Sequence, residues 1–153
     1  MSYALETIAN TFIRKAREEG RGDLTPMKLL KLVYIANGWS LGLNNQPLFA
    51  DEVEAWKYGP VVPALYHKIK QYRNRSIDRE LPEPSGVENI ETGDQRLLDR
   101  VWNTYGQHSG LTLSSITHKP GTPWDQTWDE RGIHGLIIPP SKIREHYQRL
   151  AQG

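Results

Sequence analysis

The sequence of 153 residues contains no cysteine and no long apolar stretch. Without cysteine the chain has neither a disulfide framework nor a thiolate metal site, which fits a reducing compartment. Its longest apolar runs are interrupted by Lys31, Asn37 and Ser40, well short of the roughly 20 residues that a membrane-spanning helix needs. The N-terminal residues also lack the basic start and the small-residue cleavage site of a secretory signal. We therefore expect a cytoplasmic protein that does not enter a membrane.

An excess of one charge is missing as well, because 19 basic and 18 acidic residues leave a net charge of +1. A dedicated nucleic-acid-binding domain usually has a strong basic excess, so the composition does not favour nucleic acid as a partner. One basic segment with interleaved tyrosines stands out, formed by Tyr66, Lys68, Lys70, Tyr72, Arg73 and Arg75. We interpret it as a solvated helix face whose long side chains cover apolar surface.

Signatures of metal and cofactor binding are absent from the sequence. The five histidines, at positions 67, 108, 118, 134 and 146, have no second histidine and no paired carboxylate suited to a metal three or four residues away, as a helical metal site requires. The segment Gly20-Arg21-Gly22 lacks the lysine and the strand-to-helix context of a phosphate-binding loop. We expect no metal and no cofactor.

Two groups of residues could carry catalysis on paper. Ser109, His118 and Asp125 could form a nucleophilic trio, but no strained turn surrounds the serine, and a helix cap is its simpler role. Glu52 and Glu54 would share one face of a strand, where carboxylates can act as acid and base. On an edge strand, however, such residues are typical of a solvated face. We therefore expect no enzymatic activity.

The apolar residues that are present recur with helical spacing. Between residues 5 and 16 they form one stripe, with Glu6, Asn10, Arg14 and Arg17 on the opposite side. This pattern predicts an amphipathic helix that begins near Ser2 as N-cap and stops at Gly20.

A second helix is predicted from residue 26 to about residue 41. Thr25 can cap it, and Pro26 occupies the first helical position, where its missing N–H costs nothing. Apolar residues cover nearly its whole circumference and leave a thin polar strip around Lys28 and Lys31. Such a helix lies at the centre of a fold.

Shorter elements follow this central helix. Residues 48–56 read as a strand or hairpin, a helix restarts at Pro63, and residues 74–89 form a loop. Further helices are expected after a capping box at Thr92-Gly93-Asp94-Gln95, after Ser109 or Thr112 and after Thr122-Pro123. Ile137 and Ile138 suggest a strand, which precedes a last helix. The predicted fold is mainly α: a compact single-domain helical bundle with a central buried helix and a small β element.

One combination of segments points to a family. The segments are Leu24 to Trp39, Pro47-Leu48-Phe49, Glu54 to Tyr66, Leu113, Thr117-His118 and Pro123-Trp124. Ala55-Trp56-Lys57-Tyr58-Gly59-Pro60-Val61 is the most specific block. Together they resemble the Panacea domain, the SocA-like antitoxin family that includes phage-associated GepA-type proteins. The resemblance covers residues 3–130, and we expect residues 131–153 to add a strand and a helix to the same domain.

The resemblance implies an antitoxin that neutralises a cognate protein toxin by direct binding, and it implies that some members deliver their toxin to a protease. Two other functions stay open: a phage or mobile-element accessory protein that binds a host factor or nucleic acid, and an enzyme that uses Glu52, Glu54 and His118. Most motif residues should build the scaffold, since Gly59 permits a backbone angle closed to other residues and Pro60 fixes the next one. Together they should turn the strand into the helix that restarts at Pro63. The residues with this structural role are Thr25, Pro26, Trp39, Gly59, Pro60, Pro123 and Trp124.

The partner should contact a surface outside this scaffold. Alternation along a strand places Trp56 and Tyr58 on one face and Lys57 on the other, so one side of the strand should be open. An open strand edge offers backbone hydrogen bonds to a partner chain, and Asp51 and Glu52 add charge beside it. We predict that the toxin contacts this strand and the neighbouring basic helix face, through Trp56, Lys57, Tyr58, Lys68, Lys70 and Arg73.

Overall fold

A computed structural model describes residues 2–131, 133 and 135–153. The helices are α1 (Leu5–Glu18), α2 (Pro26–Asn44), α3 (Pro63–Ile69), α4 (Thr92–Tyr105), α5 (Gly110–Thr117), α6 (Pro123–Thr127) and α7 (Pro140–Gln152), with a 3-10 turn η1 (Lys70–Tyr72) after α3. The strands β1 (Glu54–Trp56), β2 (Gly59–Val61) and β3 (Leu136–Ile137) form an antiparallel sheet in the order β2-β1-β3. The predicted fold, mainly helical with a small β element, is confirmed.

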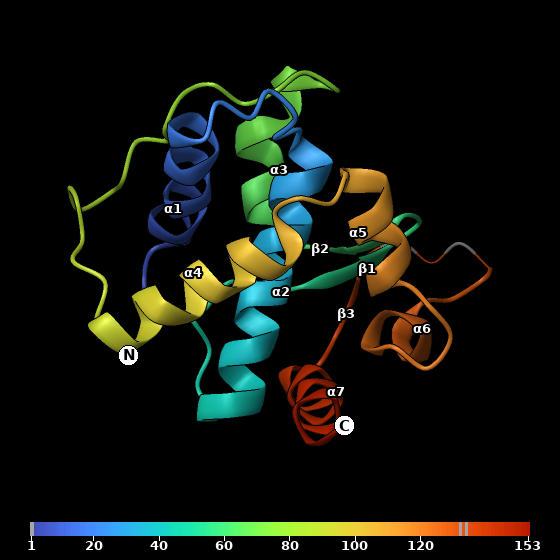
Figure 1. Cartoon of the computed structure of the whole chain (residues 1–153). Coiled ribbons are helices and arrows are strands. Elements are labelled where there is room, and N and C mark those ends of the chain that lie inside the picture. The colour runs from blue at the N-terminus through green and yellow to red at the C-terminus, as the bar shows by residue number, and fades with distance from the viewer. Residues whose placement is uncertain (1, 132, 134) are drawn as a thin grey trace.

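Helix α2 lies in the middle of the molecule, and the other elements pack around it (Figure 1). Thr25 caps it as predicted, since its hydroxyl accepts a hydrogen bond from the backbone N–H of Lys28 at 3.3 Å, and Pro26 is its first residue. The polar strip of this helix is buried together with its apolar faces. Lys28 is fully buried, with its ammonium 3.1 Å from the Asp23 carboxylate and 5.7 Å from the centre of the Trp102 ring.

Lys31 connects the central helix to the small sheet. Its side chain is buried, and its Nζ donates a hydrogen bond of 2.8 Å to the carbonyl oxygen of Pro60 in β2. Within the described residues Lys31 forms no ion pair. Burial without a compensating negative charge lowers the pKa of Lys31 to about 7.

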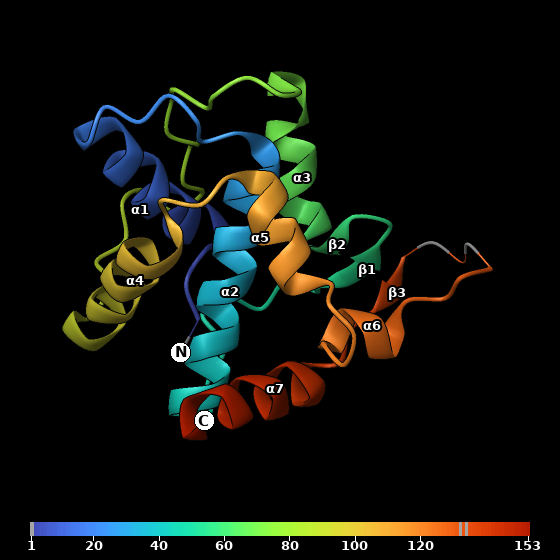
Figure 2. The ribbon, with the colours of Figure 1, turned by 45° about the vertical axis from the view of Figure 1, so that its right-hand side comes forward.

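The C-terminal half of α2 receives the last helix of the chain. Gly42 does not end α2, which continues to Asn44 and closes at Asn45 in the left-handed conformation, with φ 56°. The reason is a close contact: a Cβ atom would lie 2.2 Å from the Tyr147 ring at Gly38 and 2.7 Å from the Tyr147 Cβ at Gly42. The two glycines therefore let α7 pack directly on α2, which it crosses near the end of that helix (Figure 2).

Part of the polar side of α1 is buried. Glu6 pairs with Lys68 of α3, and Asn10 is covered by the loop between α3 and α4. The Asn10 amide donates to the Leu81 carbonyl at 2.8 Å, and its oxygen accepts from the Leu81 N–H at 2.7 Å. The Asn10 amide thus makes the pair of hydrogen bonds that a neighbouring strand would make, and it satisfies the backbone N–H and C=O of Leu81 in the interior.

The predicted helix caps were partly correct. Ser109 and Thr122 each accept a hydrogen bond from the backbone N–H three residues later, as expected. Ser2 does not cap α1, since Ala4 precedes its first residue. The capping box at Thr92 is also wrong, because α4 begins at Thr92 itself and Glu91 makes no side-chain cap. Among the described residues no helix is long and apolar enough to cross a bilayer.

The central position of α2 predicts a large cost for shortening its buried side chains. Leu30 is 5% exposed and Leu43, on the same helix, is 50% exposed. Leu30→Ala should lower the free energy of unfolding by about 2–5 kcal/mol, since it leaves a cavity in the core. Leu43→Ala is the matched control and should change it by less than about 0.5 kcal/mol. Urea unfolding measures both, and a loss below about 1 kcal/mol for Leu30→Ala would place this side of α2 at the surface.

The buried amine of Lys31 predicts a pH-dependent stability. Its pKa is about 7 in the folded chain and ordinarily 10.5, so the unfolded chain binds more protons between these values. The free-energy cost of burying the charged amine is fully present below pH 7. As the pH rises from about 7 to 10.5, the free energy of unfolding increases by up to about 1.4 kcal/mol per pH unit. Lys31→Met should flatten this rise. Equal slopes for both proteins in urea unfolding at several pH values would contradict the burial of a neutral amine.

Candidate partner-binding surface

The hairpin formed by β1, β2 and the turn at Lys57 and Tyr58 holds the most specific part of the sequence motif. Gly59 has φ 116°, which favours glycine, and a Cβ atom there would lie 3.1 Å from the Lys31 Nζ. Pro60 is tolerated because β2 is an edge strand. Both residues belong to β2, so the prediction that they turn the strand into α3 is wrong. Val62 precedes α3 instead.

Two side chains from the second half of the chain hold the hairpin turn by its backbone. The Ser114 hydroxyl donates to the Tyr58 carbonyl at 2.5 Å, and the Trp124 indole N–H donates to the Trp56 carbonyl at 2.5 Å. His118 packs its ring 5.2 Å from that of Trp124, between centres. The two separated segments of the motif therefore meet at this turn. They hold it through hydrogen bonds to backbone carbonyls, which are present whatever side chains the turn carries.

The residues considered for catalysis do not converge. Glu54 accepts a hydrogen bond from the Trp56 indole at 2.9 Å, and His118 Nδ1 lies 2.5 Å from the Ser114 carbonyl. Ser109 caps α5, and Asp125 accepts from the backbone N–H of Gly121 at 2.9 Å. Each group is thus engaged locally. Among the described residues, which exclude His134, no cluster of histidine and carboxylate side chains could hold a metal ion.

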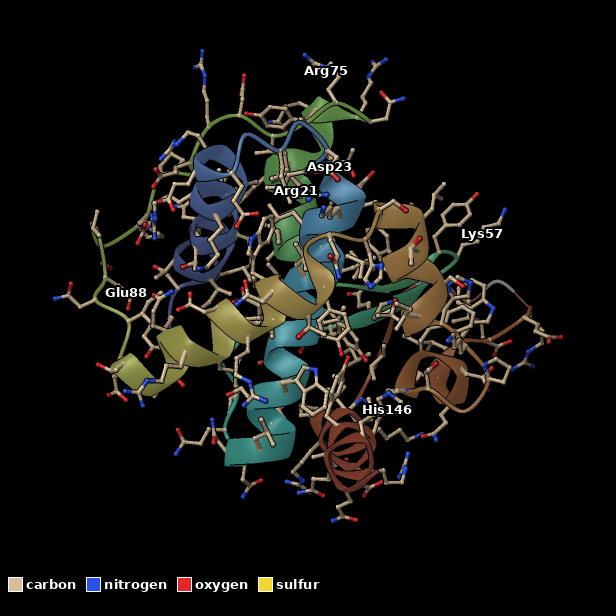
Figure 3. All side chains as sticks on the ribbon, in the orientation of Figure 1. Arg21, Asp23, Lys57, Arg75, Glu88 and His146 are labelled. Atoms are coloured by element: carbon tan, nitrogen blue, oxygen red, sulfur yellow. The ribbon has the colours of Figure 1, made fainter. Side chains whose placement is uncertain are left out.

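The predicted partner-binding residues of the hairpin lie on its outer side. Tyr58 is 60% exposed, and Lys57 lies with its Nζ 5.5 Å from the centre of the Tyr58 ring. Figure 3 shows Lys57 projecting from the body of the molecule beside α5. Trp56 is half-buried, and its ring centre lies 5.0 Å from that of Tyr66 on α3. Leu111 on α5 is 76% exposed, one turn before the serine that holds the hairpin, and its exposure was not predicted.

The basic residues of α3 and η1 continue from this side of the hairpin. The rings of Tyr66 and His67 lie 5.5 Å apart, and the Lys70 Nζ lies 3.5 Å from His67 Nδ1. Lys70 and Arg73 are exposed, whereas the Lys68 ammonium pairs with the buried carboxylate of Glu6 at 3.1 Å. The structure therefore joins the two predicted groups through Trp56 and Tyr66, with the charge of Lys68 already balanced.

The expectation of an open edge on the first strand is wrong. β1 is the central strand of the sheet, paired with β2 on one side and with β3 on the other. The partner of β1 on the far side comes from residues 136–137, and such a long-range pairing leaves no local mark in the sequence. Exposed side chains at the turn, rather than a free strand backbone, are what this region offers to another protein.

A second exposed feature was not predicted at all. A groove with a volume of about 470 Å³ lies between the C-terminal ends of α2 and α7 and one face of α4. Its apolar residues are Trp39, Leu43, Leu97, Val101 and Leu150, and Arg96 and Arg100 stand among them. Trp39, assigned to the scaffold, donates its indole N–H to the Tyr105 hydroxyl at 3.1 Å. The arginines and leucines come from three separate helices, so only the folded chain shows the groove.

Comparison with known proteins agrees with the resemblance in the sequence. The family described as "Antitoxin SocA-like, Panacea domain" matches residues 29–125, which include the hairpin and the Trp124 that holds it. Antitoxin SocA of Caulobacter vibrioides (strain NA1000 / CB15N) is 32% identical over 158 aligned positions, which cover 96% of this chain and 84% of that protein. No solved structure gives a significant match. The chain belongs to the SocA-like, Panacea-domain family of antitoxins, which are binding proteins and not enzymes.

Proposed function

We propose that this protein neutralises a cognate toxin protein by binding it directly, in the cytoplasm and without chemistry of its own. Membership of the antitoxin family carries the proposal. The arrangement of the hairpin supports it, because Ser114, Trp124 and Lys31 fix the turn through its backbone while Tyr58 stays exposed. An aromatic side chain on a fixed backbone loses little freedom when a partner covers it.

The toxin binds, in this proposal, across the hairpin turn and the outer side of α3. Tyr58 and Leu111 supply exposed apolar area, with Lys57 beside them. Lys70 and Arg73 supply positive charge that no carboxylate of the described chain balances. Lys68 contributes less, because Glu6 already neutralises it. The contact is therefore mixed in character, as in the centre and rim of a specific interface.

The same surface would serve two related activities. A bound toxin could be blocked outright, or it could be carried to a protease by the antitoxin. A phage or mobile-element accessory protein that binds a host factor would use a similar exposed face. Inspecting the neighbouring gene distinguishes an antitoxin from an accessory protein. The half-life of the toxin in cells with and without the antitoxin distinguishes occlusion from delivery to a protease.

A binding mechanism predicts that the carboxylates near the hairpin are dispensable. The reading frame next to this gene should be toxic when expressed alone and harmless together with this chain, and the two products should co-purify. Glu52→Gln combined with Glu54→Gln keeps the side-chain volume and should leave both rescue and binding within about twofold of the wild type. Loss of rescue while the toxin still binds would contradict a mechanism by binding alone.

The interface predicts that charge reversal at η1, directly after α3, weakens the complex without unfolding the antitoxin. Lys70→Glu combined with Arg73→Glu should raise the Kd for the toxin by at least about tenfold, while the thermal midpoint changes little because both side chains are exposed. Arg79→Glu combined with Lys119→Glu makes the same charge change at exposed positions elsewhere and should bind normally. Equal Kd values for the two double variants would remove η1 from the interface.

A further inference from the structure

The groove between α2, α4 and α7 is the largest feature that the proposed interface leaves unused. Leu43 and Leu150 stand on its two sides and are 50% and 48% exposed, which is high for leucine in a folded domain. The half-buried Trp39 also lines the groove. The apolar side chains share the lining of the groove with Asn44, Thr104 and two arginines, and a groove of this size and mixed character can take side chains of a partner.

The charge of the groove has one sign. Arg96 and Arg100 are one turn apart on α4, where like charges repel each other, and both are exposed. The nearby carboxylates of α4 serve other contacts, since Asp94 accepts from the Tyr3 hydroxyl and Asp99 pairs with Lys15. Within the described chain neither arginine has an ion-pair partner, and no carboxylate lines the groove. The site is built to receive negative charge beside apolar groups.

We propose that this groove binds an acidic, amphipathic helix of the cognate toxin, a second contact that rests on the proposed function and extends it. A helix docked in a groove presents apolar anchors at spacings of three and four residues. Its leucines would pack on Leu43, Leu97 and Leu150, and carboxylates on the neighbouring turn would reach Arg96 and Arg100. Arginine suits this role because its guanidinium binds a carboxylate through two hydrogen bonds.

A second copy of this chain fits the groove less well. In a two-fold dimer the same patch meets itself, so Arg96 and Arg100 would face the same arginines of the other copy. That contact would add repulsion where the charge is already unbalanced. An acidic helix of a partner would instead neutralise the charge of the two arginines.

The test measures binding of the purified toxin, the product of the neighbouring reading frame, to variants of the full-length antitoxin. Arg96→Glu combined with Arg100→Glu should raise the Kd by at least about tenfold, and Leu43→Ser should also weaken binding. Arg79→Glu combined with Lys119→Glu is the control with the same charge change. In the Arg96→Gln, Arg100→Gln variant the Kd should depend less on salt than in the wild type. Synthetic peptides of the toxin's acidic helices should compete with the toxin for the wild type but not for the arginine variants.

The outcomes separate this inference from the proposed function. If the wild type binds the toxin and the arginine variants bind it equally well, the groove is not a toxin site, while the proposed function stands. If the wild type itself does not bind the toxin, both fail. Sedimentation of the free antitoxin adds a third outcome: if the arginine substitutions change its self-association and leave toxin binding unchanged, the groove holds a second copy and the inference is wrong.

Discussion

The hydrogen bond from Lys31 to the carbonyl of Pro60 joins the central helix to the hairpin, and the rest of the arrangement depends on this junction. It places an amine in the core, where burial lowers its pKa. A hydrophobic side chain of the same length would cost less free energy to bury there. The amine satisfies a carbonyl of an edge strand that contains proline, and Gly59 leaves room for it. The buried lysine thus fixes the position of the hairpin on α2.

The hairpin is held through backbone atoms from the other side as well. Ser114 and Trp124 bond to carbonyl oxygens of the turn, and such bonds do not depend on which side chains the turn carries. The residues that point outward can therefore change without loosening the turn. These bonds therefore fix the backbone of the hairpin and leave the outward side chains of Lys57 and Tyr58 available for the contact that we propose.

Local signals in the sequence predicted much of the fold, because caps and periodicity act over a few residues. Thr25, Ser109 and Thr122 cap the N-terminal ends of helices as predicted, and Pro26 is the first residue of α2. The errors arose where distant segments decide the outcome. Asn10 looks solvent-exposed until Leu81, 71 residues away, bonds to its amide, and Gly42 looks like a helix end until Tyr147 packs on it. The outward residues of the hairpin were located from the motif, whereas its missing open edge reflects pairing with β3.

The same reasoning explains why the groove was missed and why it matters. Arg96 and Arg100 alone are two surface residues of an amphipathic helix, and Leu43 and Leu150 alone are two exposed leucines. The packing of α7 on the glycines of α2 brings the last turn of α7 beside α4, and only then do these four side chains line one groove. The family match ends at residue 125, before α7 begins, so this wall of the groove lies outside the part that defines the family. The contact that we propose for the groove therefore depends in part on a helix that lies outside the segment matched by the family.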